Sequence, residues 1–304
     1  MKFKQKFLEK YEKLTDIKEF TKYSVKPLTK SIRVNTLKIS VSELKERIEE
    51  FTLKQIPWCK EGFWVTNGPR TDLGNLVEHS LGYFYVQEAA SMIPPLALQP
   101  QKADTIIDMA AAPGSKTTQL ASMMENQGMI IANDLEFQRL KSLGINLQRC
   151  GVMNTIVTLM KGHKFTIQAD KILLDAPCSA TGAIRKSLKT VEMWNPHIAK
   201  RLAGTQNQLL QTAFSCLKPR GSLVYSTCSV SPEENELVIH EFLEKNPEAS
   251  IEKITLPGLK TSPTIEEYEK VKINREVKKC IRIWPQDNDT EGFFIAKILK
   301  TSAI

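Results

Sequence analysis

The sequence of 304 residues is poor in the residues that build metal clusters, disulfide frameworks and membrane spans. It has four histidines and six cysteines, and no Cys-x-x-Cys pair, which argues against a zinc cluster and a disulfide-rich secreted fold. No apolar run approaches the length of a membrane span, and the N-terminal MKFKQKFLEKYEKL lacks the apolar core of a signal peptide. We therefore expect a cytoplasmic protein without a membrane contact.

Two common phosphate-binding signatures are also missing. GSKTT (114–118) is close to a Walker loop, but Ser115 separates the glycine from the lysine, and Met109 stands where that loop requires glycine. The G-x-G-x-x-G pattern of dinucleotide-binding folds is absent. These absences argue against a P-loop nucleotidase and a nicotinamide-dependent enzyme.

Positive charge is concentrated at the N-terminus. Residues 1–40 hold eleven Lys or Arg and four Asp or Glu, whereas the rest of the chain is almost neutral, with 31 basic and 30 acidic residues. One reading is a solvated helix face; the other is an electrostatic footprint for a nucleic acid. Charge alone leaves both open for Lys2, Lys4, Lys6, Lys10 and Lys13.

Residues 1–100 have the pattern of a small α+β module. Apolar residues at helical spacing predict a first helix with one buried face, formed by Phe3, Phe7, Leu8, Tyr11 and Leu14. Strand-like stretches follow at 31–39, 62–65 and 82–86. Ser40 and Glu43 form a capping box for a helix between the first two of these.

Residues 101–304 predict an α/β domain. TIIDM, MIIAN, TIVTL, KILLD and SLVYS are short apolar strands separated by helical or loop sequence, the pattern of a doubly wound, Rossmann-like parallel sheet. Two further strands, at 280–285 and 292–299, can pair as closing antiparallel strands, and 257–275 is expected to be a long surface loop.

The first strand of this sheet leads into a loop of small residues, Ala110, Ala111, Ala112, Pro113 and Gly114. Their size allows a ligand to approach the backbone closely. A helix starting near Ser115 would point its free N–H groups at a carboxylate or phosphate. Asp134 ends the second strand, where an acidic residue commonly bonds ribose hydroxyls; the alternative is a simple cap for the next helix. A carboxylate and a ribose together describe S-adenosyl-L-methionine.

Two cysteines follow neighbouring strands at the same rim of the sheet. Asp175 and Cys178 end the fourth strand, and Cys228 ends the fifth, ahead of a helix that we expect to begin with Ser231 as cap and Pro232 at its first position. Buried cysteines are more often inert than reactive. Two of them beside a methyl-donor loop favour a functional interpretation.

These motifs together resemble the Sun (NOL/NOP/Sun) family of RNA cytosine-5 methyltransferases, and the archaeal tRNA members most closely. The resemblance extends over nearly the full chain and rests on SIRVNTLK (31–38), GYFYVQEAASM (82–92), DMAAAPGSKT (108–117), DAPCSATG (175–182), YSTCS (225–229) and IRIWPQDNDTEGFFIAKI (281–298). It implies a class I methyltransferase domain that uses S-adenosyl-L-methionine, with residues 1–100 as an RNA-binding module.

The resemblance also implies roles. Cys228 would be the nucleophile that adds to carbon 6 of cytosine, Cys178 would release the methylated base, and Asp175 would bond the amidine edge. Lys116 would serve either the carboxylate of the donor or Asp175.

For other residues the resemblance specifies the role less fully. Arg139 would help to hold the donor, unless it is a helix-surface arginine. After the third strand, where many relatives carry an acidic residue near the adenine of the donor, this chain has Lys161 or His163, so the resemblance does not extend to that adenine contact. We expect Met193, Trp194 and Trp284 to be packing residues, with Trp194 also a surface candidate.

We therefore predict an RNA cytosine-5 methyltransferase acting on tRNA, as a monomer, with the involvement of a site-selecting protein partner left open. Ribosomal RNA is an alternative substrate. A non-catalytic RNA-binding assembly factor is the alternative from another class, and the four residues Lys116, Asp175, Cys178 and Cys228 argue against it. A small-molecule methyltransferase is disfavoured by the basic N-terminus and the paired cysteines.

Overall fold

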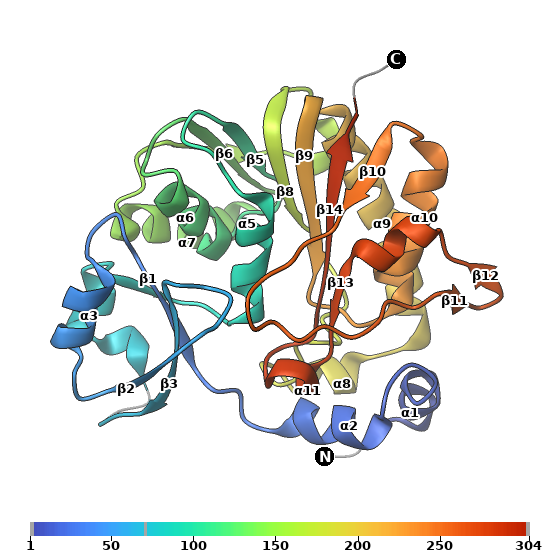
Figure 1. Cartoon of the computed structure of the whole chain (residues 1–304), viewed down its shortest axis with the longest axis horizontal. Helices are drawn as coiled ribbons and strands as arrows, with labels where there is room; N and C mark the ends of the chain where they lie inside the picture. Colours follow the sequence, from blue (N-terminus) through green and yellow to red (C-terminus); the bar gives the residue numbers. More distant parts are fainter. Residues whose placement is uncertain (1–2, 70–71, 302–304) are drawn as a thin grey trace.

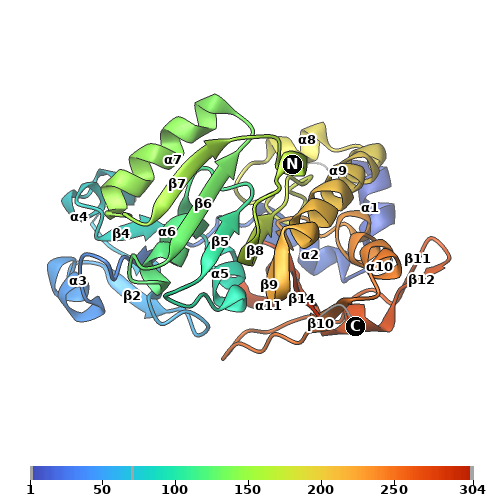
Figure 2. The same cartoon turned by 90° about the horizontal axis from the view of Figure 1, so that it is seen from above.

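The computed structural model describes residues 3–69 and 72–301. Its central element is an eight-stranded sheet with the order β10-β14-β9-β8-β5-β6-β7, and β13 pairs with β14 (Figures 1 and 2). The five predicted parallel strands are confirmed as β5 (Thr105–Asp108), β6 (Met129–Asp134), β7 (Thr155–Leu159), β8 (Ala169–Asp175) and β9 (Leu217–Thr227). Because β5 lies between β6 and β8, the strand order reverses there, at the place where open α/β sheets bind ligands.

The closing strands are also confirmed. β13 (Ile281–Ile283) and β14 (Phe293–Lys300) pair antiparallel, and β14 pairs antiparallel with β9. β10 (Ala249–Glu252) extends the sheet beyond β14. The strand that carries Cys228 at its end is therefore internal, with β8 on one side and β14 on the other.

Helices cover both faces of this sheet (Figure 2). They are α5 (Ile93–Leu98), α6 (Ser115–Met123), α7 (Phe137–Cys150), α9 (Pro196–Ser215) and α10 (Glu236–Lys245). The short helix α8 (Lys189–Met193) instead packs through Val191 with the aromatic residues of the first two helices. Alternate strand residues face opposite cores: Ile107 and Tyr225 pack with α9 and α10, whereas Ile106 and Val224 pack with α5 and α6. Across the two described ranges, no helix has both the length and the apolar character that crossing a bilayer needs.

The N-terminal module has its own sheet, with the order β2-β3-β1-β4. Its strands are β1 (Ser31–Val34), β2 (Thr52–Gln55), β3 (Gly62–Asn67) and β4 (Phe84–Val86), of which β2 was not predicted. The capping box is confirmed at the start of α3 (Val41–Arg47), where the Ser40 and Glu43 side chains each accept from the backbone of the other residue. Short elements η1 (Leu73–Asn75) and α4 (Val77–Ser80) lie between β3 and β4, and η2 (Ala90–Met92) joins β4 to α5.

The first two helices, α1 (Gln5–Tyr11) and α2 (Ile17–Val25), lie away from that small sheet and beside the C-terminal part of the chain (Figure 1). Phe7 and Phe20 pack edge-on against Trp194 and Trp284 at centroid distances of 5.2 Å. Trp194 is therefore a buried packing residue, and its reading as a surface residue is wrong. Met193, which we expected to be packed, is 70% exposed. The domain division at residue 100 stays a prediction.

Part of the N-terminal positive charge is engaged within the protein. The Lys4 ammonium donates to the backbone oxygens of Glu192 and Trp194 at 2.8 and 2.6 Å. Lys10 bonds both oxygens of Glu233 at 2.9 Å. These two lysines are thus neither a solvated helix face nor a free nucleic-acid contact.

The predicted helix after Cys228 is interrupted. A single turn, η4 (Pro232–Glu234), precedes α10, and the backbone turns away from helical geometry at Asn235, with φ −121° and ψ −96°. The Asn235 side chain donates to Ser229 O and accepts from Thr227 Oγ1, at 2.9 and 2.6 Å. Bonds to the loop that carries Cys228 therefore displace the expected continuous helix, and the Ser231 side chain makes no cap.

The rest of the C-terminal region is largely extended. Residues 257–275 form the expected loop with a small hairpin, β11 (Glu267–Tyr268) and β12 (Val271–Lys272). The short elements η3 (Gly162–Lys164), η5 (Arg275–Lys279) and α11 (Pro285–Asn288) complete the described fold.

Phe20→Ala should lower the free energy of unfolding by about 3–5 kcal/mol, because it empties the centre of the aromatic cluster between α2 and Trp284. Phe137→Ala is the matched control, since Phe137 is 62% exposed and its loss should have little effect. Urea denaturation of both variants measures the difference. Equal losses would show that α2 does not depend on this cluster.

Candidate active site

The loop after β5 places an open helix end at the rim of the sheet. Gly114, with φ +105°, is the N-cap of α6, and no side chain caps that end. A Cβ at this position would lie 3.0 Å from Leu143, so the left-handed backbone and the space both favour glycine. Ala111 N donates to Asn133 O at 2.7 Å and fixes the loop on β6. The first N–H groups of α6 can therefore receive a carboxylate.

Asp134 and Arg139 hold this loop from the next βα unit. Asp134 Oδ2 accepts from Ala112 N at 3.2 Å, and Arg139 donates to Ala112 O at 2.6 Å. Arg139 also lies 3.3 Å from Asp134, so it is more than a helix-surface arginine. The N-cap of α7 is Glu136, so Asp134 does not cap that helix.

The loop and its support suit S-adenosylmethionine in charge and shape. The uncapped end of α6 would take the carboxylate of the donor. Asp134 Oδ1 accepts one hydrogen bond, from Glu136 N, which leaves it capacity for a ribose hydroxyl. The contacts of Asp134 and Arg139 with the donor stay predictions.

Lys116 and Asp175 form an ion pair beside this loop. The ammonium nitrogen lies 2.6 Å from Asp175 Oδ2, and Ser226 Oγ donates to Asp175 Oδ1 at 2.7 Å. Burial lowers the pKa of Lys116, but the contact with Asp175 outweighs it and the net shift is upward. The sequence left two partners open for Lys116, the carboxylate of the donor and Asp175. In this structure Lys116 contacts Asp175.

The two predicted cysteines meet at the same rim. Cys178 Sγ and Cys228 Sγ are 3.3 Å apart, and both residues are half-buried, whereas the other cysteines of the chain are buried. The hydrogen bond to Cys228, burial, and the charges of Cys228 and Glu234 raise the pKa of Cys178 well above its ordinary value. Cys178 therefore retains its proton at neutral pH.

Arg33 is a supporting residue that the sequence interpretation did not single out. It is 2% exposed, and it donates to the side chain of Gln87, to Ser115 O at 2.8 Å and to Thr118 Oγ1 at 3.0 Å. A buried cation from β1 thus holds the first turn of α6. An arginine between the apolar residues of SIRV is the signal that points to it.

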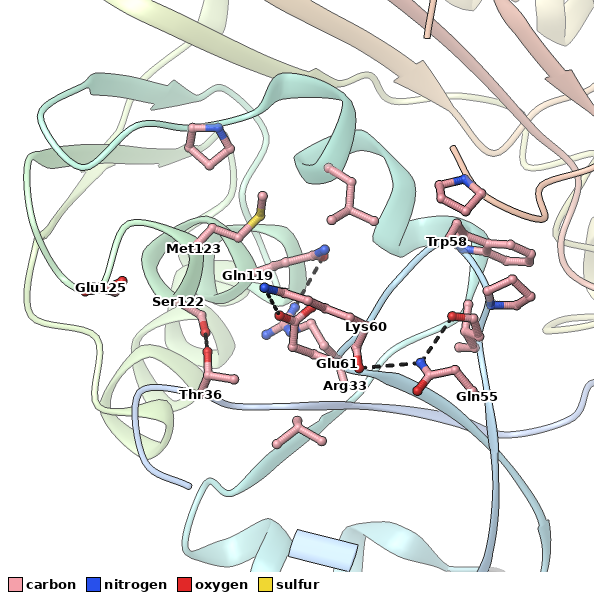
Figure 3. A pocket seen from close by; sticks show the side chains of 16 residues that line it. Arg33, Thr36, Gln55, Trp58, Lys60, Glu61, Gln119, Ser122, Met123 and Glu125 are labelled. Atoms are coloured by element: carbon pink, nitrogen blue, oxygen red, sulfur yellow. Dashed lines mark hydrogen bonds and ion pairs between the residues drawn. The ribbon is translucent and has the colours of Figure 1, made fainter. Parts of the chain in front are cut away.

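Arg33 also lines a pocket of about 780 Å³ that borders Gln119, Lys60 and Glu61 (Figure 3). The pocket runs along the second half of α6. There the hydroxyl oxygens of Thr36 and Ser122 are hydrogen-bonded at 2.6 Å. Neither cysteine nor Asp175 lines it. This cavity is therefore separate from the residues that could do the chemistry.

Asp108 is a second supporting residue that the prediction omitted. It ends β5 directly before the loop, is 1% exposed, and accepts from Thr117 Oγ1 at 2.7 Å. Burial raises its pKa to about 7. A carboxyl group that titrates near neutral pH thus lies beneath this loop.

Comparison with known families decides the identity of this fold and site. The model described as 16S rRNA methyltransferase RsmB/F matches residues 95–299, and the model of the N-terminal domain of 16S rRNA methyltransferase RsmF matches residues 3–89. The chain belongs to the RsmB/F methyltransferase family. This is the Sun family that the motifs indicated, so the resemblance is confirmed.

Two curated relatives differ in name and in length. The tRNA (cytosine(49)-C(5))-methyltransferase of Pyrococcus abyssi is 49% identical over 98% of this chain and 97% of that protein. The ribosomal RNA small subunit methyltransferase F of Vibrio atlanticus is 43% identical over 95% of this chain, which spans only 61% of that protein. RsmB/F proteins are S-adenosylmethionine-dependent RNA methyltransferases, and these relatives support RNA cytosine-5 methylation for the chain.

Solved structures confirm the Rossmann-like fold. A methyltransferase homologue from Pyrococcus horikoshii is 38% identical and superposes with a TM-score of 0.88 over 98% of this chain and 95% of that one. NSun6 from Pyrococcus horikoshii with SFG is 28% identical, with a TM-score of 0.87 over 99% of both chains. The RsmB/F fold is therefore present over nearly the whole chain.

Asp108→Asn should flatten the pH dependence of stability. The carboxyl group titrates near 3.8 when unfolded and near 7 when folded, so its stabilising contribution is complete below about pH 4 and is lost as the pH rises to about 7. Between pH 5 and 7 the wild type should lose more stability than the variant, by up to about 1.4 kcal/mol per pH unit. Urea denaturation at pH 5, 6 and 7 measures both slopes, and identical slopes would contradict the assignment.

Proposed function

We propose that this chain methylates carbon 5 of cytosine in tRNA, with Cys228 as the nucleophile. The observation that carries the proposal is the pair of thiols 3.3 Å apart beside the Lys116–Asp175 ion pair. The tRNA assignment is supported by the relative of the same length, whose name specifies tRNA, whereas the relative named for ribosomal RNA has additional chain.

The residue types suit the chemistry of a weak carbon nucleophile. A Cys228 thiolate adds to carbon 6 of the flipped cytosine, and the electrons of the double bond then make carbon 5 nucleophilic. When bound, S-adenosylmethionine supplies an electrophilic methyl group on its sulfonium sulfur. Asp175, held by Lys116 and Ser226, accepts a hydrogen bond from the exocyclic amine of cytosine.

Cys178 acts later, when the product is released. The hydrogen bond to Cys228 is the largest cause of the raised pKa of Cys178. That hydrogen bond is altered once the sulfur of Cys228 is covalently bonded to carbon 6. Cys178 then loses its proton to solvent more readily and, as a thiolate, takes the proton from carbon 5. The bond between carbon 6 and sulfur breaks, and its electron pair returns to Cys228.

The RNA contact would come from the lysines of the N-terminal helices that remain exposed. Lys6, Lys13 and Lys18 are exposed on or beside α1 and α2. Basic side chains at such positions favour a polyanion through counterion release. These exposed lysines would bind the RNA, and the donor site would supply the methyl group.

Ribosomal RNA is the second candidate substrate. Both matching family models are described by 16S rRNA methyltransferases, and the Vibrio relative is named for the small ribosomal subunit. A non-catalytic assembly factor is disfavoured, because such a protein would have no chemical need for the contacting thiols and the buried ion pair.

The substrate is tested by transfer of a labelled methyl group from S-adenosylmethionine to tRNA and, separately, to ribosomal RNA, followed by nucleoside analysis. We expect 5-methylcytidine in tRNA. Label in ribosomal RNA alone would replace the substrate and keep the chemistry. Donor binding without transfer to either RNA would favour the assembly factor.

The two cysteines are tested by alanine variants. Cys228→Ala should lower transfer by at least about a thousandfold and form no covalent RNA adduct, because the nucleophile is lost. Cys178→Ala should accumulate an adduct that survives denaturing electrophoresis, because release is slowed. Cys280→Ala, in the buried core, is the matched control and should retain transfer without an adduct. An adduct in Cys228→Ala would exchange the two roles.

A further inference from the structure

One buried carboxylate connects the two cysteine loops. Glu234, in η4, is 0% exposed. It accepts hydrogen bonds from Ser179 N at 2.8 Å, from the Ser179 hydroxyl, and from Ser229 Oγ at 2.5 Å. Ser179 directly follows Cys178, and Ser229 directly follows Cys228. This one side chain therefore bonds both of the loops that carry the thiols.

Helix α9 supports the same clamp. Gln206, also 0% exposed, donates from Nε2 to Glu234 at 3.1 Å and to Pro177 O at 2.8 Å. The main chain adds a direct bond between the loops, since Gly182 N donates to Cys228 O at 2.9 Å. The two loops are thus held by a hydrogen-bonded network with Glu234 at its centre.

The partners of Glu234 favour a negative charge. The Ser179 N–H can only donate, and the Ser179 and Ser229 hydroxyls and the Gln206 amide nitrogen also donate to the carboxylate oxygens in this structure. Burial raises the pKa of Glu234, while its bonds to Ser179, Ser229 and Gln206 oppose that shift. Burial is the larger effect, so the net shift of the Glu234 pKa is upward, and the donors offset part of the cost of burying the charge.

The charges around the two thiols are unequal. The negative charge of Glu234 lies close enough to Cys178 to favour its protonated form, and the positive charge of Lys116 interacts with Cys228. The titratable groups that face Cys178 from the surrounding elements are Cys228, Glu234 and Tyr225. Asp175 is balanced by its contact with Lys116 at 2.6 Å, so Glu234 is the uncompensated charge.

We propose that Glu234 is a positioning residue that holds the two thiols in contact and keeps the proton on Cys178, so that Cys228 is the thiol free to act as nucleophile. The catalytic part of this inference rests on the proposed function, in which Cys228 is the nucleophile. The asymmetry of the thiols is a property of the protein alone, and it can be measured without RNA or methyl donor.

Thiol alkylation as a function of pH tests the proposal. Iodoacetamide is applied to the full chain, and peptide mass spectrometry follows Cys178 and Cys228 separately. In the wild type, Cys228 should react at lower pH than Cys178. In Glu234→Gln the midpoint of the Cys178 profile should fall to a lower pH, because a nearby negative charge is removed.

Two further variants separate charge from packing. Glu233→Gln is the matched control: the same change in the same turn, at a residue that bonds Lys10 and touches neither cysteine. It should leave both profiles unchanged. Glu234→Asp keeps the charge and should keep the Cys178 midpoint near that of the wild type. If only the packing of Glu234 mattered, this shorter side chain would not be expected to preserve the midpoint.

Three outcomes would overturn the inference. They are a wild type in which Cys178 reacts at the lower pH, a Glu234→Gln profile with an unshifted Cys178 midpoint, and an equal rise in the reactivity of both thiols at every pH. The wild-type profile needs no variant and can refute the inference by itself, whereas the role of Glu234 is decided by the Glu234→Gln profile. Failure of RNA methylation with an intact thiol asymmetry would refute the proposed function and leave this inference standing.

Discussion

The parallel pairing of β8 with β9 is the constraint on which the site depends. The register aligns Asp175 with Ser226, so the two strands end at the same level and their loops leave the sheet side by side. Without this alignment Cys178 and Cys228, which are fifty positions apart in the chain, would have no reason to meet. β14, paired antiparallel with β9 on its other side, keeps that strand internal.

Around this alignment, the site is assembled from buried charges that are each held by a partner. Lys116 is matched by Asp175, and Glu234 is matched by hydrogen-bond donors from both loops. The described hydrogen bonds of Arg33 go to carbonyl, amide and hydroxyl oxygens around α6, and none of these partners is a carboxylate. Such groups are costly to bury, and their positions are correspondingly well defined.

The sequence predicted the strands because their apolar runs are short, regular and bounded by turn residues, and strand order then brought Cys178, Cys228 and Asp175 together. It failed where side-chain contacts from outside an element override the preference of the local sequence. The helix expected from Ser231 onward breaks at Asn235, because that side chain bonds Thr227 and Ser229.

Tertiary packing explains the other differences. Trp194 is buried because Phe7 packs against it from the far end of the chain, a contact that no local pattern can reveal. Glu234 and Asp108 were overlooked for the same reason: acidic residues beside a strand or in a first helical turn usually face solvent. Only the folded arrangement shows that both are enclosed.

The meeting of α1 and α2 with Trp284 and Gln286 has a consequence for synthesis on the ribosome. Gln286 bonds Thr15 across 271 positions of sequence. At ordinary elongation speeds of about 5–20 residues per second, the aromatic face of the first helices therefore waits for some tens of seconds before its partner emerges. During that interval Phe7, Tyr11 and Phe20 form an apolar segment that a nascent-chain chaperone can recognise.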